Sequence, residues 1–193
     1  MRVIGLTGSA AMGKSTVAKM FAEAGMPVFD ADATVHELYA GEAAPLIETA
    51  FPGTASDGAV DRVALRGRVL GDDAAMKQLE AIVHPLVRAR EMAFRDAAAK
   101  AGARAIVLDI PLLMETGGEA RIDAVVVVSA PADVQRARLR GRGLDEAAID
   151  RLLARQMPDA EKRRRAHFVI DTGTSLEATR RAVGDLMRAI AGA

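Results

Sequence analysis

A glycine-rich stretch near the N-terminus carries the residue types that bind a nucleotide phosphate. Residues 8–16 read Gly-Ser-Ala-Ala-Met-Gly-Lys-Ser-Thr and fit the pattern G-x-x-x-x-G-K-[ST]. Gly8 and Gly13 let the backbone approach phosphate oxygens without an intervening Cβ. Lys14 can reach the β- and γ-phosphates, and Ser15 can offer its hydroxyl to Mg²⁺. The spacing predicts a protein that binds a nucleoside triphosphate, with a chance glycine turn as the alternative.

Carboxylates follow two apolar runs at positions that suit phosphoryl transfer. Asp30 and Asp32 follow residues 26–29, and Asp109 closes residues 105–108. Phosphoryl transfer needs one carboxylate for the attacking hydroxyl and another for the metal. We assign the first role to Asp32 and the second to Asp109. The alternatives are a helix N-cap for Asp32 and a helix-cap or loop carboxylate for Asp109. Asp30 is interpreted as structural or as a contact to metal-bound water.

An arginine-rich segment, residues 136–165, predicts a lid over the triphosphate. Ten basic residues stand against five acidic ones there, and all the basic residues except Lys162 are arginines. Arginine suits bidentate contact with phosphate. Two helices joined by Gly141-Arg142-Gly143 can close over a ligand and exclude water, as a kinase requires to favour its acceptor over hydrolysis. A solvated helix face is the alternative for the remaining charges.

Two further side chains, His36 and Arg88, are candidates for an acceptor pocket that binds a phosphorylated ligand. His84 precedes Pro85 within a long helical pattern, and by itself it fits a packed or capping histidine better than a ligand. Because no second histidine stands at metal-ligand spacing from it, we exclude a metal site there.

Apolar runs that alternate with amphipathic stretches position these residues. The expected strands cover residues 3–7, 26–30, 104–109, 122–128 and 166–170. The expected helices cover residues 17–24, 33–39, 45–51, 62–70, 72–100, 131–140, 146–157 and 176–190, with a kink or a break at Pro85. This alternation predicts an α/β fold, a P-loop NTPase-like, doubly wound, parallel five-stranded sheet flanked by helices. Ligands of such sheets bind at the carboxyl ends of the strands.

The length of 193 residues predicts a single P-loop kinase domain. Within it we expect a core of about residues 1–32, 103–135 and 166–193, a helical acceptor region of about residues 33–102, and the lid of about residues 136–165. Half of the residues are hydrophobic and only 3% are aromatic, so the core must consist of Ala, Val, Leu, Ile and Met.

Composition also limits the partners and the location. The chain has no cysteine, which excludes disulfides, thiolate metal sites and cysteine nucleophiles. The formal charge of zero gives no electrostatic case for nucleic acid or an anionic membrane. The sequence has no apolar run long enough to span a bilayer, and its first apolar run is interrupted by Gly5 and Thr7. We expect a cytoplasmic protein, a monomer or small homo-oligomer, whose partner is a small-molecule substrate.

Seven groups of residues, in this order and spacing, resemble the dephospho-CoA kinase family over nearly the whole chain. They are residues 5–16, Asp30-Ala31-Asp32 with His36, His84-Pro85-Leu86, Asp109-Ile110-Pro111-Leu112-Leu113 with Glu115, Arg140 with Arg142, Arg155-Gln156, and residues 166–170 followed by Gly173. Many NTPases share the phosphate loop alone, so the specificity of the resemblance comes from the combination.

The resemblance implies the last step of coenzyme A synthesis, in which ATP phosphorylates the 3′-hydroxyl of the dephospho-CoA ribose. It makes Asp32 the base for that hydroxyl. Lys14 and a lid arginine would stabilise the transferring phosphoryl group; both Arg140 and Arg142 fit, and Arg142 is favoured. With the assignments above, ATP would be bound by Gly8, Ala11, Met12, Gly13, Lys14, Ser15 and Thr16. Mg²⁺ would be bound by Ser15 and Asp109. The acceptor would be bound by Asp32, His36, His84, Arg88, Leu112 and Leu113.

Two other functions stay open at this point: a different small-molecule kinase acting on a nucleoside or nucleotide, and a non-catalytic ATP-binding regulatory protein. The carboxylate pair at Asp30 and Asp32 argues against a nucleoside monophosphate acceptor, because it would repel a second phosphate. The loop also departs from the family pattern, with Ser9, Ala11 and Met12 in place of Gly, Gly and Ser. Ala11 stands where a positive φ is favoured, so either the loop is strained or Ala11 has an ordinary φ.

Overall fold

Strands that are apolar on both faces are typical of a parallel sheet, because the helices that connect parallel strands cover both faces of the sheet. In the computed structural model, which describes residues 1–191, the strands lie in the order β2-β5-β1-β6-β7. β1 runs parallel to β5 and β6, and β6 runs parallel to β7. The strands are β1 (Arg2–Thr7), β2 (Val28–Asp30), β5 (Ala105–Asp109), β6 (Ala124–Ser129) and β7 (Phe168–Asp171). This order confirms the predicted α/β fold.

The chain divides into two compact units. The first, which we call the phosphate-loop unit, comprises Met1–Phe29 and the chain from Ala98 onward; the second, the helical unit, comprises Asp30–Ala97. The helices of the phosphate-loop unit are α1 (Lys14–Glu23), α6 (Ala132–Arg140), α7 (Glu146–Ala154), α8 (Asp159–Arg165) and α9 (Leu176–Ala191), with a 3₁₀ turn at Gly118–Arg121. The acceptor region expected at residues 33–102 falls largely in the helical unit.

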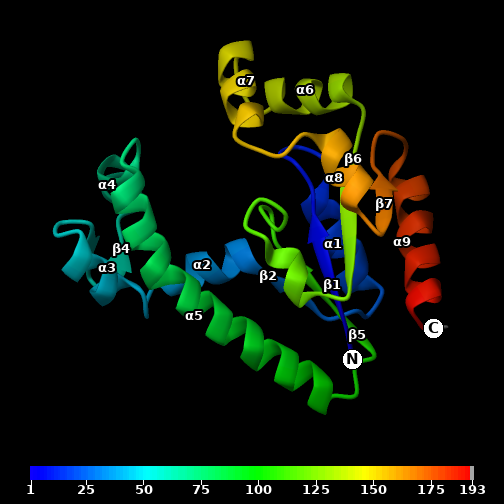
Figure 1. Ribbon diagram of the computed structural model, residues 1–193, viewed down its shortest axis with the longest axis horizontal. Helices are drawn as coiled ribbons and strands as arrows, with labels where there is room; N and C mark the ends of the chain where they lie inside the picture. Colours follow the sequence, from blue (N-terminus) through cyan, green and yellow to red (C-terminus); the bar gives the residue numbers. More distant parts are fainter. Residues whose placement is uncertain (192–193) are drawn as a thin grey trace. The chain divides into compact units, whose positions relative to one another are not determined.

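Both faces of the sheet are buried in the phosphate-loop unit. On one face α1 and α9 pack against the strands, and Figure 1 shows α9 running beside β7. The largest apolar cluster joins Ile4, Leu6, Val17, Phe21, Val126, Val128, Val183 and Leu186. A smaller cluster on the other face contains Leu113, Met114, Val125 and Val127. As expected from the composition, aliphatic residues dominate both clusters.

The helical unit has a core of its own. Its elements are α2 (Ala31–Tyr39), α3 (Ala44–Ala50), β3 (Ala55–Ser56), β4 (Ala59–Val60), α4 (Arg62–Val69) and α5 (Asp73–Lys100), of which α5 ends in the phosphate-loop unit. β3 and β4 form an antiparallel hairpin that the sequence analysis did not predict. Asp57 and Gly58 both have positive φ, 51° and 78°, as a two-residue hairpin turn requires. The buried core residues include Leu38, Ile47, Leu65, Leu79 and Val83.

Two expectations about the helices are wrong: a break in the helix at Pro85, and a helix end at residue 157. α5 continues through Pro85 as one helix, because proline removes only one i→i−4 hydrogen bond and the flanking residues are good helix formers. The segment after residue 154 is not part of α7: a turn follows, and then α8 begins behind Pro158, which suits the start of a helix. None of the helices within residues 1–191 is both long and apolar enough to cross a membrane.

Candidate functional site

The phosphate loop leads into the open N-terminus of α1. Gly13 is the residue before the helix, with φ 89°, and no side chain caps the first turn. The first turn contains no acidic residue either. The backbone N–H groups at the start of a helix have no intrahelical partner, and the helix dipole favours an anion there. The loop therefore presents N–H donors and positive potential to a phosphate group.

Both glycines of the motif are required by their surroundings. A Cβ on Gly8 would lie 2.6 Å from the backbone oxygen of Val128, so only glycine lets the loop pass this close to β6. A Cβ on Gly13 would lie 3.1 Å from Oγ1 of Thr172, and its φ of 89° is one that other residues rarely adopt.

Ala11 adopts a left-handed conformation, with φ 61°. The sequence left open whether this residue is strained, and the backbone shows that it is, because a Cβ is disfavoured in this region. The side chain is buried and packs with Leu139 of α6 and Ile149 of α7. Burial of the methyl group offsets part of the backbone strain.

Lys14 and Asp109 form an ion pair beside the loop. They meet because the β1–β5 register places Leu6 beside Asp109, so that β5 ends where β1 leads into the loop. Asp109 is 2% exposed and the Lys14 side chain is 15% exposed. The structure thus places the expected phosphate-binding lysine and the expected metal-binding carboxylate in direct contact.

α6, α7 and the turn between them form a helix–turn–helix segment, which we call the α6–α7 hairpin (Figure 1). It carries Arg140 and Arg142, the two arginines expected to act on the phosphoryl group. Arg140 Nε donates to Glu146 Oε1 at 2.5 Å, and this hydrogen bond is the largest of the causes that hold the pKa of Glu146 below its ordinary value. Arg136 contacts Glu146 and Asp150 at 2.7 and 2.5 Å. Arg142, in the turn, has no side-chain ion pair among the described residues.

A cavity of about 440 Å³ lies beside the loop. Its lining residues come from the loop, the start of α1, the α6–α7 hairpin and the segment after β7; they are Ala11, Gly13, Thr16, Arg138, Gly141, Arg142, Thr172, Thr174, Leu176 and Thr179. Arg138 donates to the Ala11 carbonyl at 3.2 Å and to the Thr172 carbonyl at 2.6 Å. Thr172 Oγ1 in turn donates to the Met12 carbonyl at 2.6 Å. Hydrogen bonds of Arg138 and Thr172 therefore hold this wall of the cavity against the loop.

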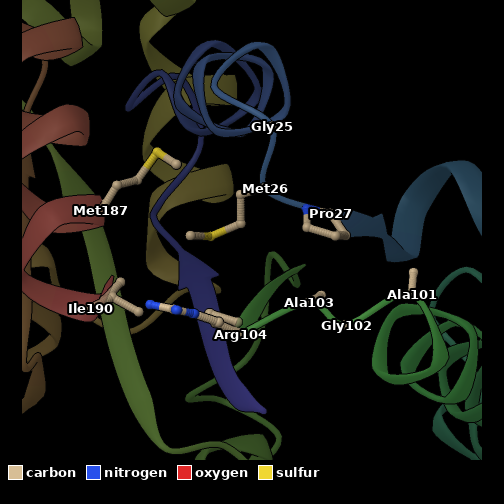
Figure 2. Close-up of a pocket in the computed structure, with 10 residues that line it drawn as sticks. Gly25, Met26, Pro27, Ala101, Gly102, Ala103, Arg104, Met187 and Ile190 are labelled. Atoms are coloured by element: carbon tan, nitrogen blue, oxygen red, sulfur yellow. The ribbon is translucent and has the colours of Figure 1, made fainter. Parts of the chain in front are cut away.

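A second cavity, of about 330 Å³, lies at the opposite end of the sheet. Figure 2 shows Met26, Met187 and Ile190 around it, with the Arg104 side chain extending toward Ile190. Pro27 precedes β2 and Ala105 begins β5, so this cavity adjoins the amino ends of those strands. Parallel sheets bind ligands at the carboxyl ends. The functional cavity is therefore the one beside the phosphate loop.

In the helical unit, four candidate acceptor side chains form two pairs. Asp32 and His36 stand four residues apart on α2, and His84 and Arg88 stand four residues apart on α5, so each pair shares a helix face. All four residues are exposed, and none makes a side-chain hydrogen bond or ion pair within the part of the chain that the structure describes. They are therefore available to a ligand.

The expected capping alternative for Asp32 is wrong. The N-cap of α2 is Asp30, whose carboxylate accepts a hydrogen bond from the Ala33 N–H at 2.9 Å, and Asp32 lies in the first helical turn. The chain thus assigns the structural role to Asp30 and leaves the Asp32 carboxylate without a capping partner.

Of the two leucines expected beside the acceptor, one is a core residue. Leu113 is fully buried and packs with Met114, Val125 and Val127. Leu112 is 43% exposed. Only Leu112 can touch a ligand in this arrangement, and Leu113 anchors the segment that follows β5.

Several polar residues of the site were not assigned roles from the sequence. Arg138 and Thr172 line the cavity, and Gln135 and Gln156 form hydrogen bonds with the loop residue Ala10. The family motif Arg155-Gln156 was a sequence signal that could have identified Gln156. Arg138 could not be distinguished from the other arginines of residues 136–165. Thr172 and Gln135 gave no signal, because their partners are backbone atoms far away in the sequence.

The comparisons with known proteins agree with this geometry. The family model described as dephospho-CoA kinase matches residues 2–178. The chain belongs to the dephospho-CoA kinase family. A dephospho-CoA kinase of Rhodopseudomonas palustris is 59% identical over 192 residues, which cover 99% of this chain and 96% of the relative.

Solved structures give the same result. A protein from Thermus thermophilus matches with a TM-score of 0.84 and 35% identity, over 97% of each chain. A dephospho-CoA kinase from Campylobacter jejuni matches with a TM-score of 0.76 and 27% identity, over 100% of this chain and 98% of the other. The resemblance stated from the sequence is thereby confirmed, as is the assignment of the chain to the kinases.

Proposed function

We propose that this kinase transfers the γ-phosphoryl group of ATP to the 3′-hydroxyl of the dephospho-CoA ribose, giving coenzyme A and ADP. The observation that carries the proposal is the phosphate loop at the open N-terminus of α1, with Lys14 and Asp109 in contact beside it. Membership of the dephospho-CoA kinase family, which matches residues 2–178, supports dephospho-CoA as the acceptor. The acceptor is a small molecule, so the reaction needs no macromolecular partner.

ATP is bound by the loop, residues 8–16, and by the cavity beside it. The N–H groups of the loop and of the first turn of α1 donate to the phosphate oxygens. Lys14 leaves Asp109 and turns to the β- and γ-phosphates when they arrive, because a triphosphate offers it more negative charge than one carboxylate does. The Arg138 and Thr172 side of the cavity faces the remainder of the nucleotide.

Ser15 and Asp109 fit Mg²⁺, since a hydroxyl and a carboxylate are the oxygen donors that this ion prefers. Residues 1–191 contain no group of three or more His, Cys, Asp or Glu side chains that could hold a metal ion. This agrees with a magnesium ion that takes most of its ligands from the nucleotide and from water. When bound, Mg²⁺ neutralises charge that develops on the phosphates.

Asp32 accepts the proton of the attacking hydroxyl as the oxygen bonds to the γ-phosphorus and ADP leaves. Lys14 and Arg142 stabilise the negative charge on the transferring phosphoryl group. We choose Arg142 over Arg140 because Arg140 is engaged by Glu146, whereas Arg142 lines the cavity. The α6–α7 hairpin acts as the lid, and its closure excludes water from the phosphoryl group.

The acceptor is bound by exposed side chains of the helical unit and by Leu112. His36 and His84 contribute hydrogen-bond donors, and Arg88 contributes positive charge, which suit the phosphate groups of dephospho-CoA. Leu112 contributes apolar contact from the segment after β5.

The test is a coupled assay of ADP formation with ATP and each of three acceptors: dephospho-CoA, AMP and GMP. The proposal predicts turnover with dephospho-CoA and little with the two nucleotides. Turnover with AMP but not with dephospho-CoA would establish a nucleotide kinase. ATP binding without turnover of any acceptor would establish a regulatory protein.

A further inference from the structure

One residue of the phosphate loop, Ala10, is hydrogen-bonded to both ends of the α6–α7 hairpin. The Ala10 N–H donates to Gln156 Oε1 at 3.0 Å, and the Ala10 carbonyl accepts from Gln135 Nε2 at 2.8 Å. Gln135 lies in the second turn of α6, near the start of the hairpin, and Gln156 lies in the turn that follows α7. A single loop residue thus contacts the hairpin where it begins and where it ends.

Apolar contacts join the same two parts of the molecule. Ala10 and Ala11 belong to a cluster that includes Leu139 of α6 and Ile149 of α7. Leu139 and Ile149 are 1% and 0% exposed, so the loop completes the core of the hairpin. Close-packed groups transmit displacement, because a void or an overlap costs free energy. A shift of the loop backbone is therefore felt by both helices.

The turn after α7 is also held by residues outside the loop and the hairpin. The N–H of Met157 donates to Glu115 Oε1 at 3.0 Å, and Nζ of the fully buried Lys162 lies 2.8 Å from the same oxygen. These contacts fix the backbone next to Gln156. Because this backbone is fixed, a shift of Ala10 moves the hairpin through the Gln156 side chain and is not lost in movement of the turn.

From this arrangement we infer that Gln135 and Gln156 are positioning residues that couple the phosphate loop to the α6–α7 hairpin. Neither side chain reaches the triphosphate in this account; both act through Ala10. When ATP occupies the loop, the loop sets the position of the hairpin. The position of the hairpin in turn places Arg142 and determines whether water is excluded from the phosphoryl group. The inference rests on the proposed function, because it needs a triphosphate in the loop and a hairpin that excludes water.

The consequence of losing this coupling is a measurable rate of ATP hydrolysis. When the hairpin is not held against a filled loop, water attacks the γ-phosphorus in place of the acceptor hydroxyl. ATP then gives ADP and inorganic phosphate, and no acceptor is phosphorylated. The quantity to follow is the inorganic phosphate released for each coenzyme A formed.

The test uses Gln135→Met and Gln156→Met, since methionine keeps the length of glutamine and removes its amide. Gln78→Met, on the exposed surface of α5, is the matched control. For each of the two variants we expect kcat of transfer to fall about threefold to tenfold, the scale of one lost hydrogen bond. The KM for dephospho-CoA stays unchanged, and phosphate released per coenzyme A rises by a similar factor. The double variant loses less than the product of the two single effects, because both act through Ala10.

An unchanged ratio of phosphate to coenzyme A in both variants would overturn the inference, even if their melting temperatures fall, because a loss of stability alone does not change the ratio. The same change in Gln78→Met would overturn it as well. If Gln135→Met does not fold, the half-buried Gln156 still supplies the test. If the unchanged chain makes no coenzyme A, the proposed function fails instead. In that case the ATP hydrolysis rates of the variants decide: a rise supports the coupling, and no change refutes it.

Discussion

Two cationic side chains beside the phosphate loop are held by other groups of the phosphate-loop unit, whereas the polar side chains expected to act on the acceptor are exposed on the helical unit. Lys14 is paired with Asp109, and Arg138 is bound to two backbone carbonyls. Asp32 and His36, by contrast, make no side-chain hydrogen bond or ion pair among the residues described. The helices of the helical unit are fixed through their buried faces, but the acceptor-side groups that they carry are not.

This difference suits the two tasks. Charge that develops on a phosphoryl group is stabilised best by donors that are already in place. An acceptor that carries a diphosphate can order exposed side chains as it binds, and it supplies the binding energy for doing so. Substitution of the held side chains of the phosphate-loop unit should therefore change both kcat and stability, whereas substitution of the exposed acceptor-side residues of the helical unit should change activity alone.

The largest expected effect is at Asp32. Asp32→Asn removes the proton acceptor and should lower kcat by about 10² to 10⁴, the scale of general base catalysis. Because Asp32 is exposed and not a cap, the melting temperature should stay close to that of the unchanged chain. Steady-state kinetics and a thermal melt measure both quantities.

Asp30→Asn is the matched control, since asparagine is also a good N-cap and keeps the hydrogen bond to Ala33. It should leave kcat nearly unchanged. Equal losses of activity in the two variants would contradict the assignment of Asp32, and not Asp30, as the catalytic base.

The next effect is on stability, at the pair formed by Glu115 and the fully buried Lys162. Glu115→Gln leaves the ammonium of Lys162 fully buried without a counter-charge, and we expect a loss of about 3 kcal/mol in the free energy of unfolding. Denaturant unfolding measures this loss. Lys162→Met, which fills the same space with an apolar side chain, should cost less. If Glu115→Gln unfolds at the same denaturant concentration as the unchanged chain, the pair does not support the fold.

The same pair predicts a pH dependence. Burial raises the pKa of the Glu115 carboxyl, but Lys162 and the Met157 N–H lower it, and the net pKa lies below its ordinary value. A lowered folded-state pKa contributes stability above the unfolded-state pKa, and this contribution is lost as the pH falls through the folded-state value. The difference in unfolding free energy between the unchanged chain and Glu115→Gln should therefore shrink below about pH 4. A constant difference from pH 7 to pH 3 would contradict this prediction.

A smaller effect on rate separates the two arginines of the hairpin. Arg142→Ala should lower kcat about tenfold to hundredfold, because it removes a charge that acts on the phosphoryl group. Arg140→Ala should change kcat little, since it loses only an exposed ion pair with Glu146. Side-by-side kcat values check this, and a larger loss for Arg140→Ala would reverse the assignment.

Local sequence patterns predicted the parts of the fold that depend on local rules. The glycine loop, the strand before it and the helix after it follow from spacing, and β1, β5 and β6 follow from continuous apolar runs. Local patterns did not decide between a kink and a break at Pro85 and did not predict the capping role of Asp30, because each depends on a balance between neighbouring residues. The hydrogen bonds of Thr172 and Gln135 to the loop join residues more than 120 positions apart, and no local pattern encodes such contacts.

The smallest expected effect tests the strain at Ala11. Ala11→Gly relieves a left-handed alanine, worth about 1–2 kcal/mol, but loses a buried methyl of about 0.8 kcal/mol and makes the unfolded chain more flexible by about 0.4–1 kcal/mol. These terms nearly cancel, so the melting temperature should shift by no more than about 4 °C. Ala10→Gly is the matched control, because Ala10 has no positive φ to relieve and loses only the favourable terms. It should be the less stable of the two by about 1 kcal/mol. Equal stabilities would mean that Ala11 carries no strain, and that the loop tolerates alanine there without help from the hairpin.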